Sequence, residues 1–115
     1  MPRMLVMLLL FFFFCLNVSA EQKTDITVGG DHNYPPYEFV KNGKPTGFNV
    51  ELLAAAAELA GYNVNFKLSK WADSVKKLEA GKIDAITGMY FSEERDEKFD
   101  FSLPYLLVSP GIFTS

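Results

Sequence analysis

The spacing of hydrophobic and polar positions changes several times along the chain, and three stretches have the spacing of strands. Residues 25–29 alternate polar with apolar side chains and then meet Gly30 and Asp31, which predicts a short strand ending in a turn. Residues 62–68 alternate strictly and predict a half-buried strand. Residues 83–87 form a short apolar run, which predicts a third strand.

The first of two longer predicted helices covers residues 50–60, between the first two strands. Asn49 is expected to cap this helix with its side chain, and Gly61 is expected to end it. The apolar face predicted for the helix consists of Leu52, Leu53, Ala56, Leu59 and Ala60.

A second helix is indicated by three apolar residues at intervals of four and three, namely Trp71, Val75 and Leu78. This helix is expected to stop near Gly81, because glycine readily adopts the backbone conformation that ends a helix. We expect Trp71 to belong to the core.

The stretch between the first strand and the first helix has no helical spacing. A proline pair excludes a helix over residues 32–37, which we interpret as an ordered loop. Residues 38–48 predict a small hairpin around Asn42 and Gly43, a pair that favours tight turns.

The predicted order of strand, helix, strand, helix and strand implies an α/β fold with a parallel sheet and right-handed crossovers. In the common 2-1-3 strand order, residues 31–37 and residues 88–95 follow neighbouring strands and lie side by side over a crevice. The carboxyl ends of parallel strands carry the ligand site in such sheets. The sequence therefore predicts a binding site between these two loops.

The N-terminal segment has the features of a secretory signal peptide. Residues 4–16 are an unbroken run of 13 apolar side chains, preceded by Arg3 and followed by small residues at Val18 and Ala20. The run is shorter than the roughly 20 residues that span a hydrocarbon core. We predict cleavage after Ala20 and export, most simply to a bacterial periplasm, of one domain over residues 21–115; an uncleaved anchor is the alternative.

Composition excludes several classes of function. With 11 basic and 14 acidic residues the net charge is −3, so the chain has no basic excess with which to bind nucleic acid. Cys15 is the only cysteine and lies in the predicted signal peptide, which excludes a disulfide framework and a cysteine-based metal site. His32 is the only histidine, and no nucleophile is paired with it. We therefore predict no metal, no cofactor and no catalytic residue.

Arg95 is the only arginine after the signal peptide, although nine lysines are present. Its planar guanidinium fits a carboxylate with two hydrogen bonds, which lysine does not reproduce. Spacing alone favours a plainer alternative, in which Arg95 lies on a solvated helix start and pairs with a neighbouring carboxylate. Ser92 is expected to cap that short helix, with Glu93 and Glu94 in its first turn.

Two tyrosines flank the proline pair of the first loop. Tyr34 and Tyr37 either present flat faces to a ligand or cover the edge of the sheet, and the pattern does not choose between these roles.

Five segments in order resemble motifs of the bacterial extracellular solute-binding proteins of family 3, the two-lobed periplasmic receptors for polar amino acids. They read GGDHNYPPY (29–37), GFNVEL (47–52), GKIDAI (81–86), SEER (92–95) and FDFSLPY (99–105). Each motif alone is weak, but five in register are specific, and the similarity spans essentially residues 21–115. It implies the first lobe of a Venus-flytrap fold, with the second lobe absent.

The resemblance also implies roles for five residues. Arg95 takes the position that clamps the α-carboxylate of the ligand, helped by backbone N–H groups of Gly88 and Tyr90. Tyr34 takes the position that stacks on the ligand side chain. Asp31 takes that of a polar residue that contacts the far end of the ligand. In this family the second lobe supplies the acidic partner of the ammonium group.

The function implied by the resemblance is binding of a small polar solute, most specifically an amino acid, for ABC-type uptake through a membrane permease. Residues 84–95 are one residue shorter than in well-known transport receptors, and this form also resembles sensor domains fused to membrane-bound signalling proteins such as histidine kinases. An enzyme related to dehydratases or lytic transglycosylases of the same fold is a third alternative, which no catalytic pair supports.

Overall fold

The computed structural model describes Arg3 and residues 20–115. The predicted signal peptide lies, apart from Arg3 and Ala20, outside these residues, so its cleavage and the alternative of an anchor stay predictions. None of the helices in the described part of the chain has the length and hydrophobicity needed to cross a bilayer.

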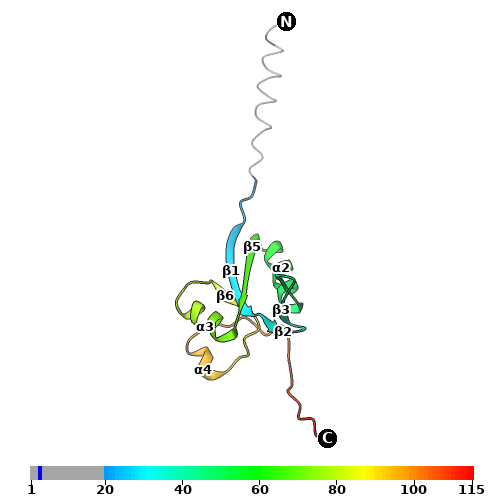
Figure 1. Cartoon of the computed structure of the whole chain (residues 1–115). Helices are drawn as coiled ribbons and strands as arrows, with labels where there is room; N and C mark the ends of the chain where they lie inside the picture. The colour runs from blue at the N-terminus through cyan, green and yellow to red at the C-terminus, as the bar shows by residue number, and fades with distance from the viewer. Residues whose placement is uncertain (1–2, 4–19) are drawn as a thin grey trace.

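A three-stranded parallel sheet forms the centre of the molecule, with β1 (Thr24–Asp31) between β5 (Tyr62–Ser69) and β6 (Ala85–Ile86) (Figure 1). β1 and β5 pair along their whole length, from Thr24 opposite Tyr62 to Asp31 opposite Ser69. The parallel α/β fold and the 2-1-3 strand order are thus confirmed. β6 is shorter than the predicted strand over residues 83–87.

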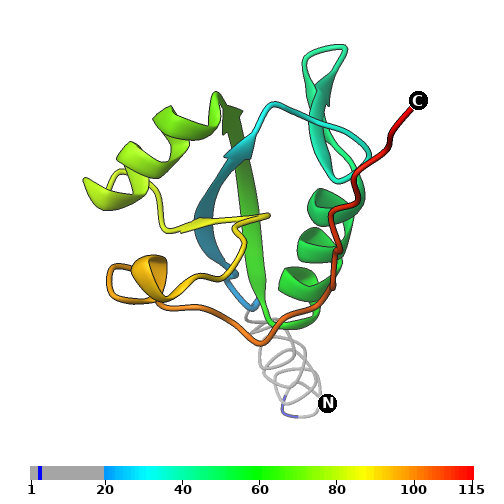
Figure 2. The same cartoon turned by 90° about the horizontal axis from the view of Figure 1, so that it is seen from below.

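The two long helices cover opposite faces of this sheet. α2 (Phe48–Leu59) and α3 (Trp71–Glu79) lie on either side of β1 and β5 when the molecule is viewed along the sheet (Figure 2). The chain crosses from β1 to β5 in one direction and from β5 past β1 to β6 in the other, so right-handed crossovers place the helices on opposite faces. The direction changes between the carboxyl ends of β1 and β6, which is where sheets of this kind place a ligand crevice.

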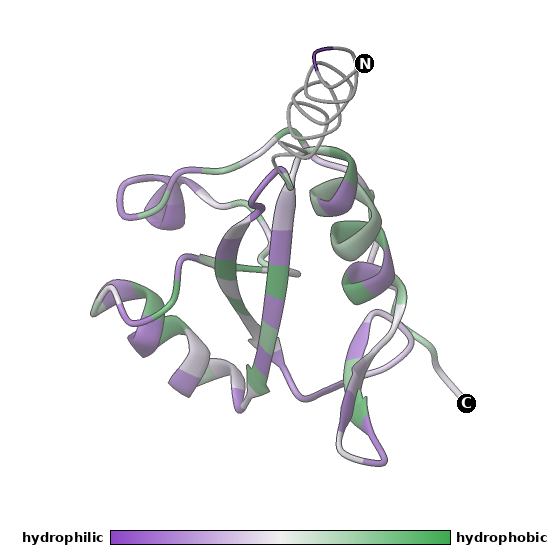
Figure 3. Ribbon diagram, turned by 90° about the horizontal axis from the view of Figure 1, so that it is seen from above, coloured by the Kyte–Doolittle hydropathy of each residue, from purple (hydrophilic) through white to green (hydrophobic). Residues whose placement is uncertain are grey.

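The hydrophobic core is centred on Val28, which is 0% exposed in the middle of β1. Val50 and Ala57 of α2 are buried on one face of the sheet, and Ile83 is buried before β6. Figure 3 shows hydrophobic bands on the strands and on α2.

α2 differs from its prediction in two ways. It begins at Phe48 after Gly47, so Asn49 lies in the first turn with its side chain buried, and the predicted Asn49 cap is wrong. The predicted apolar face is also wrong in part, because Leu59 is 91% exposed whereas Ala57 is buried. The helix is apolar around most of its circumference, so periodicity does not select the face that meets the sheet.

α3 is a helix as predicted, but its contact with the sheet is partly polar. Ser74 is fully buried, and its hydroxyl donates to the Gly30 carbonyl at 2.8 Å and lies 2.7 Å from the Ser69 hydroxyl. Trp71, expected in the core, is half-buried at the first position of the helix.

A small antiparallel sheet lies beside the central one and consists of β2 (Asn33–Tyr34), β3 (Glu38–Lys41) and β4 (Lys44–Thr46). The hairpin prediction is confirmed: Asn42 (φ 52°) and Gly43 (φ 75°) both adopt the left-handed backbone that such a turn requires. The loop predicted over residues 32–37 contains the two-residue strand β2.

Candidate functional site

Two loops meet above the carboxyl ends of β1 and β6. One contains Tyr34, and the other contains Tyr90 and leads to α4 (Glu93–Asp96). The hydroxyl oxygens of Tyr34 and Tyr90 are 2.7 Å apart and share a hydrogen bond. The prediction that these loops lie side by side is therefore confirmed.

The tyrosines form an aromatic wall on this crevice. The rings of Tyr34 and Tyr37 are tilted by 31° with their centroids 5.3 Å apart, and Tyr34 and Tyr90 remain 38% and 50% exposed. The hydrogen bond to Tyr34, with smaller effects of desolvation and nearby negative charge, raises the pKa of Tyr90 to about 12. The Tyr90 hydroxyl is therefore neutral at physiological pH, and the wall can make polar and apolar contacts.

A cavity of about 420 Å³ lies against this wall, within the size range of sites for small molecules. Three of the predicted site residues line it, namely Tyr34, Gly88 and Tyr90. Tyr37 and Asn49 contribute to the same cavity, and residues 101–108 form its other side.

The turn at Gly88 supplies hydrogen-bond donors beside the cavity. Gly88 has a φ of 76°, and the backbone N–H groups of Gly88 and Tyr90 donate to no acceptor among the described residues. Unpaired N–H groups next to an arginine are suited to bind a carboxylate.

Arg95 is positioned by α4 and by the tyrosine loop. Ser92 caps α4 as predicted, since its hydroxyl accepts from the Arg95 N–H at 3.2 Å. The Arg95 guanidinium donates through Nη1 to the Tyr90 carbonyl at 2.8 Å. Among the described residues no carboxylate contacts the Arg95 guanidinium, so the alternative pairing with a neighbouring carboxylate is absent. Arg95 is not itself part of the cavity wall.

Asp31 lies at the end of β1 but away from the cavity wall. Its carboxylate accepts from the Asn33 N–H at 2.9 Å and lies 3.4 Å from Nδ1 of His32. The structure thus brings four of the five predicted residues into one neighbourhood and leaves the Asp31 side chain in a local turn. A ligand contact of Asp31 stays a prediction.

Glu38 is a residue that the sequence reasoning missed. It begins β3 and is 1% exposed, with its carboxylate accepting from the Asp31 N–H at 2.8 Å and from Nδ2 of Asn49 at 3.1 Å. Burial raises the pKa of Glu38 above its ordinary value of 4.5, although these hydrogen bonds act in the opposite direction. A carboxylate in an otherwise aromatic and apolar stretch, between Tyr37 and Phe39, was the only available signal.

A larger groove of about 1000 Å³ runs along the free edge of β6. Leu52 and Leu53 of α2 line it together with Ile86 and residues 98–103. The groove explains why Leu52 is 40% exposed, but it lacks the tyrosine wall and contains neither Tyr34 nor Tyr90. We therefore place the candidate site in the smaller cavity.

Comparison with known families and proteins identifies relatives of this chain. The bacterial extracellular solute-binding proteins, family 3, match residues 26–115. The L-cystine-binding protein TcyJ of Escherichia coli K12 is 36% identical over 94 residues, which is 80% of this chain and 35% of that protein. A probable histidine-binding protein of Campylobacter jejuni is 33% identical over 94 residues, covering 79% of this chain and 37% of that protein. The chain spans about a third of the length of these relatives.

Several solved structures are also similar to this chain. A histidine kinase sensor domain with similarity to periplasmic binding proteins is 45% identical, with a TM-score of 0.63 over 67% of this chain and 34% of that one. The L-cystine receptor of Neisseria gonorrhoeae is 35% identical, with a TM-score of 0.64 over 77% and 40% of the two chains. The arginine-bound domain 1 of TmArgBP is 35% identical, with a TM-score of 0.64 over 70% and 66%.

Proposed function

Because the chain belongs to the bacterial extracellular solute-binding proteins, family 3, we propose that it forms the first lobe of a receptor for an amino acid that is taken up by an ABC-type transporter. The observation that carries the proposal is the cavity lined by Tyr34, Gly88 and Tyr90, with Arg95 held beside it. The family consists of solute-binding proteins, and we assign no enzymatic role.

The residues of the site suit the two ends of an amino acid. Arg95 uses one N–H to hold the Tyr90 carbonyl, and a guanidinium has five, so donors remain for a carboxylate. The N–H groups of Gly88 and Tyr90 add neutral donors next to that charge. The exposed ring of Tyr34 offers a flat surface for the ligand side chain.

Location and partners follow from the same proposal. The relatives are extracellular or periplasmic, and we propose that residues 1–20 are a signal peptide cleaved after Ala20. A membrane permease would then receive the ligand. L-cystine, L-histidine and L-arginine are suitable ligands to test first, because proteins that bind or are thought to bind them are 36%, 33% and 30% identical.

A sensing role is the second candidate, favoured by the 45% identity to a histidine kinase sensor domain. In that case ligand binding would bias the output of a fused signalling module. The reading frame beyond Ser115 discriminates between the two roles. A transmembrane segment followed by a kinase-like domain supports sensing, and a second lobe followed by a stop codon supports uptake.

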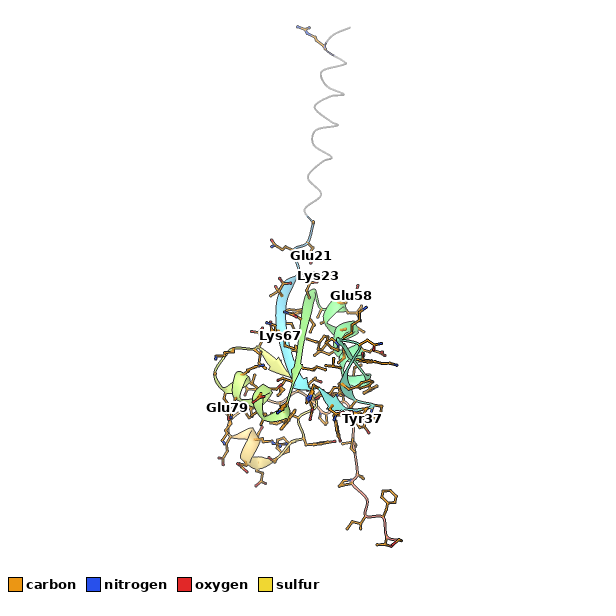
Figure 4. All side chains as sticks on the ribbon, viewed as in Figure 1. Glu21, Lys23, Tyr37, Glu58, Lys67 and Glu79 are labelled. Atoms are coloured by element: carbon orange, nitrogen blue, oxygen red, sulfur yellow. The ribbon has the colours of Figure 1, made fainter. Side chains whose placement is uncertain are left out.

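Calorimetry on the full-length protein tests the site with L-cystine, L-histidine and L-arginine. We expect one of them to bind, and Arg95→Ala to cost about 2–5 kcal/mol, because the substitution leaves the ligand carboxylate without its charged partner. Arg95→Lys should recover only part of this loss. The matched control is Lys67→Ala, an exposed cation on β5 (Figure 4), which should leave affinity unchanged. Unchanged affinity in Arg95→Ala rejects the assignment of Arg95, and no binding of any of the three rejects these ligands.

A further inference from the structure

Glu38 has the largest side chain that is fully buried in the described part of the chain. Removing a carboxylate from water is costly unless partners replace its hydration. No lysine or arginine side chain pairs with Glu38 among residues 20–115. Hydrogen bonds alone therefore compensate its burial, and their geometry decides what the carboxylate does.

Both carboxylate oxygens are used, and each reaches a different element. Oε1 accepts from the N–H of Asp31 at the end of β1, and Oε2 accepts from Nδ2 of Asn49 in the first turn of α2. The carboxylate thus joins the start of the Tyr34 loop to the start of the helix behind it.

The same carboxylate packs against the second loop of the site. A Cβ built on Gly88 would lie 2.9 Å from each oxygen of Glu38, and one built on Gly30 would lie 3.0 Å from Oε1. The carboxylate therefore fills the space left by two glycines, one at the end of β1 and one just after β6. Tyr34 and Tyr90 follow these points by four and two residues.

We propose that Glu38 is a positioning residue for the binding site: its ionised carboxylate fixes the end of β1, the first turn of α2 and the Gly88 turn relative to one another, and protonation loosens them and weakens ligand binding. The proposal rests on the proposed function, because it assigns Glu38 to the same site. Glu38 itself does not line the cavity and acts through the residues that do.

Protonation of Glu38 changes its hydrogen bonds because it converts one acceptor oxygen into a donor. An ionised carboxylate accepts at both oxygens, whereas a carboxylic acid presents an O–H that faces the N–H of Asp31 or of Asn49. One of the two hydrogen bonds is then weakened. The titratable groups that face Glu38 are Asp31, whose charge disfavours the ionised form, and the Tyr90 hydroxyl.

The direction of the pH effect follows from burial, which raises the pKa of Glu38 above 4.5. Affinity should fall as pH falls through this raised pKa, because the ionised form holds the site. The contribution of Glu38 to folding has the opposite sign: the folded state binds the proton more tightly than the unfolded chain, so this contribution grows as pH falls through the folded pKa. As pH falls, ligand affinity should therefore decrease while the contribution of Glu38 to folding stability increases. These opposite trends distinguish the positioning effect from unfolding of the protein by acid.

The test compares Glu38→Gln with the wild type and with Glu58→Gln, in the full-length protein. Glu58 is exposed near the C-terminal end of α2, which is the end farther from Tyr37 (Figure 4). The dissociation constant of whichever of L-cystine, L-histidine and L-arginine binds the wild type is measured by calorimetry from pH 8 to pH 5. We expect Glu38→Gln to weaken binding about tenfold or more at pH 8, because it loses a hydrogen bond to a charged group, and to flatten the pH profile. Parallel profiles for Glu38→Gln and the wild type would overturn the proposal.

A second measurement does not depend on the ligand. Amide hydrogen exchange followed by NMR should show the Asp31 N–H protected in the wild type and in Glu58→Ala, and exchanging about tenfold faster or more in Glu38→Ala, which removes both acceptor oxygens. The β5 amides should be unchanged. If none of the three amino acids binds, the proposed ligands fail while the Asp31 amide still decides the role of Glu38. Equal protection in all three proteins rejects that role.

Asn49→Ala keeps the proposal testable if Glu38→Gln does not fold. It removes the partner of Oε2 alone, a hydrogen bond that lowers the pKa of Glu38. The midpoint of the affinity profile should therefore move to higher pH. A midpoint that stays in place contradicts the assignment of the pH effect to Glu38.

Discussion

Gly88→Ala tests whether the buried Glu38 carboxylate is fixed in place. Gly88 has a φ of 76°, in the left-handed region that residues with a Cβ avoid. The new Cβ would also lie 2.9 Å from both oxygens of Glu38, closer than real contacts of this kind. A flexible side chain would swing away, but this carboxylate is held by hydrogen bonds from Asp31 and Asn49.

Two costs contribute to the expected loss of stability. The left-handed backbone costs a residue with a Cβ about 1–2 kcal/mol. Forcing a methyl group into a filled space costs about 1–3 kcal/mol more. We therefore expect Gly88→Ala to lower the free energy of unfolding by about 2–5 kcal/mol.

Gly81→Ala is the matched control, because Gly81 has a similar φ of 66° and nothing within 4 Å of an added Cβ. It should cost about 1–2 kcal/mol, so the difference between the two variants measures the contact with Glu38. Urea unfolding followed by circular dichroism gives both free energies. If the two variants agree within about 0.5 kcal/mol, the Glu38 carboxylate is free to move and the reasoning is refuted.

Two further predictions concern the core and the aromatic wall. Val28→Ala removes buried methyl groups at the centre of β1 and should lower the free energy of unfolding in urea by about 2 kcal/mol. Val40→Ala changes a side chain that is 41% exposed and should cost about 0.5 kcal/mol, so equal costs would contradict the placement of the core. Tyr34→Phe removes the main cause of the raised pKa of Tyr90, so this pKa should fall from about 12 towards 10.0 in an NMR titration, whereas Tyr62→Phe should leave it unchanged. An unchanged pKa of Tyr90 in Tyr34→Phe would show that the hydroxyl pair is not formed in solution.

The sequence predicted parts of both sheets where its signals were local and strong. Strict alternation over residues 62–68 corresponds to β5 of the central sheet, and Asn42-Gly43 corresponds to the hairpin turn of the small antiparallel sheet. The 2-1-3 order was expected because it is common in sheets of this kind, and the strand pairing confirms it. These features depend on backbone preferences more than on the identity of a packing partner.

α2 was predicted less well because its burial depends on tertiary contacts. Its apolar residues surround most of the helix, so the sheet-facing side is set by packing and not by the hydrophobic pattern. Asn49 looked like a cap because Asn favours that position, yet Gly47 precedes the helix and Asn49 pairs with Glu38. The partner of Asn49 is eleven residues away, which no local rule anticipates.

The sequence predicted which residues form the candidate site but not the hydrogen bonds that join them. The resemblance pointed to Tyr34, Gly88, Tyr90 and Arg95, and the structure brings these four together. It gave no indication that Tyr34 and Tyr90 share a hydrogen bond, or that Arg95 is held by a backbone carbonyl. Both contacts join residues that spacing alone does not relate.

The contacts of the site have an order that runs from the core outward. Glu38 lies deepest and packs against Gly88, and Gly88 leads to Tyr90, whose carbonyl holds the Arg95 guanidinium. A change at Glu38 or Gly88 is therefore expected to displace Tyr90 and Arg95 as well. Arg95 lies at the end of the series, so its substitution removes only the charge and the hydrogen bond of its own side chain. Loss of affinity together with a changed pH profile is thus the expected mark of the inner positions, and loss of affinity in an otherwise unchanged fold is the expected mark of Arg95.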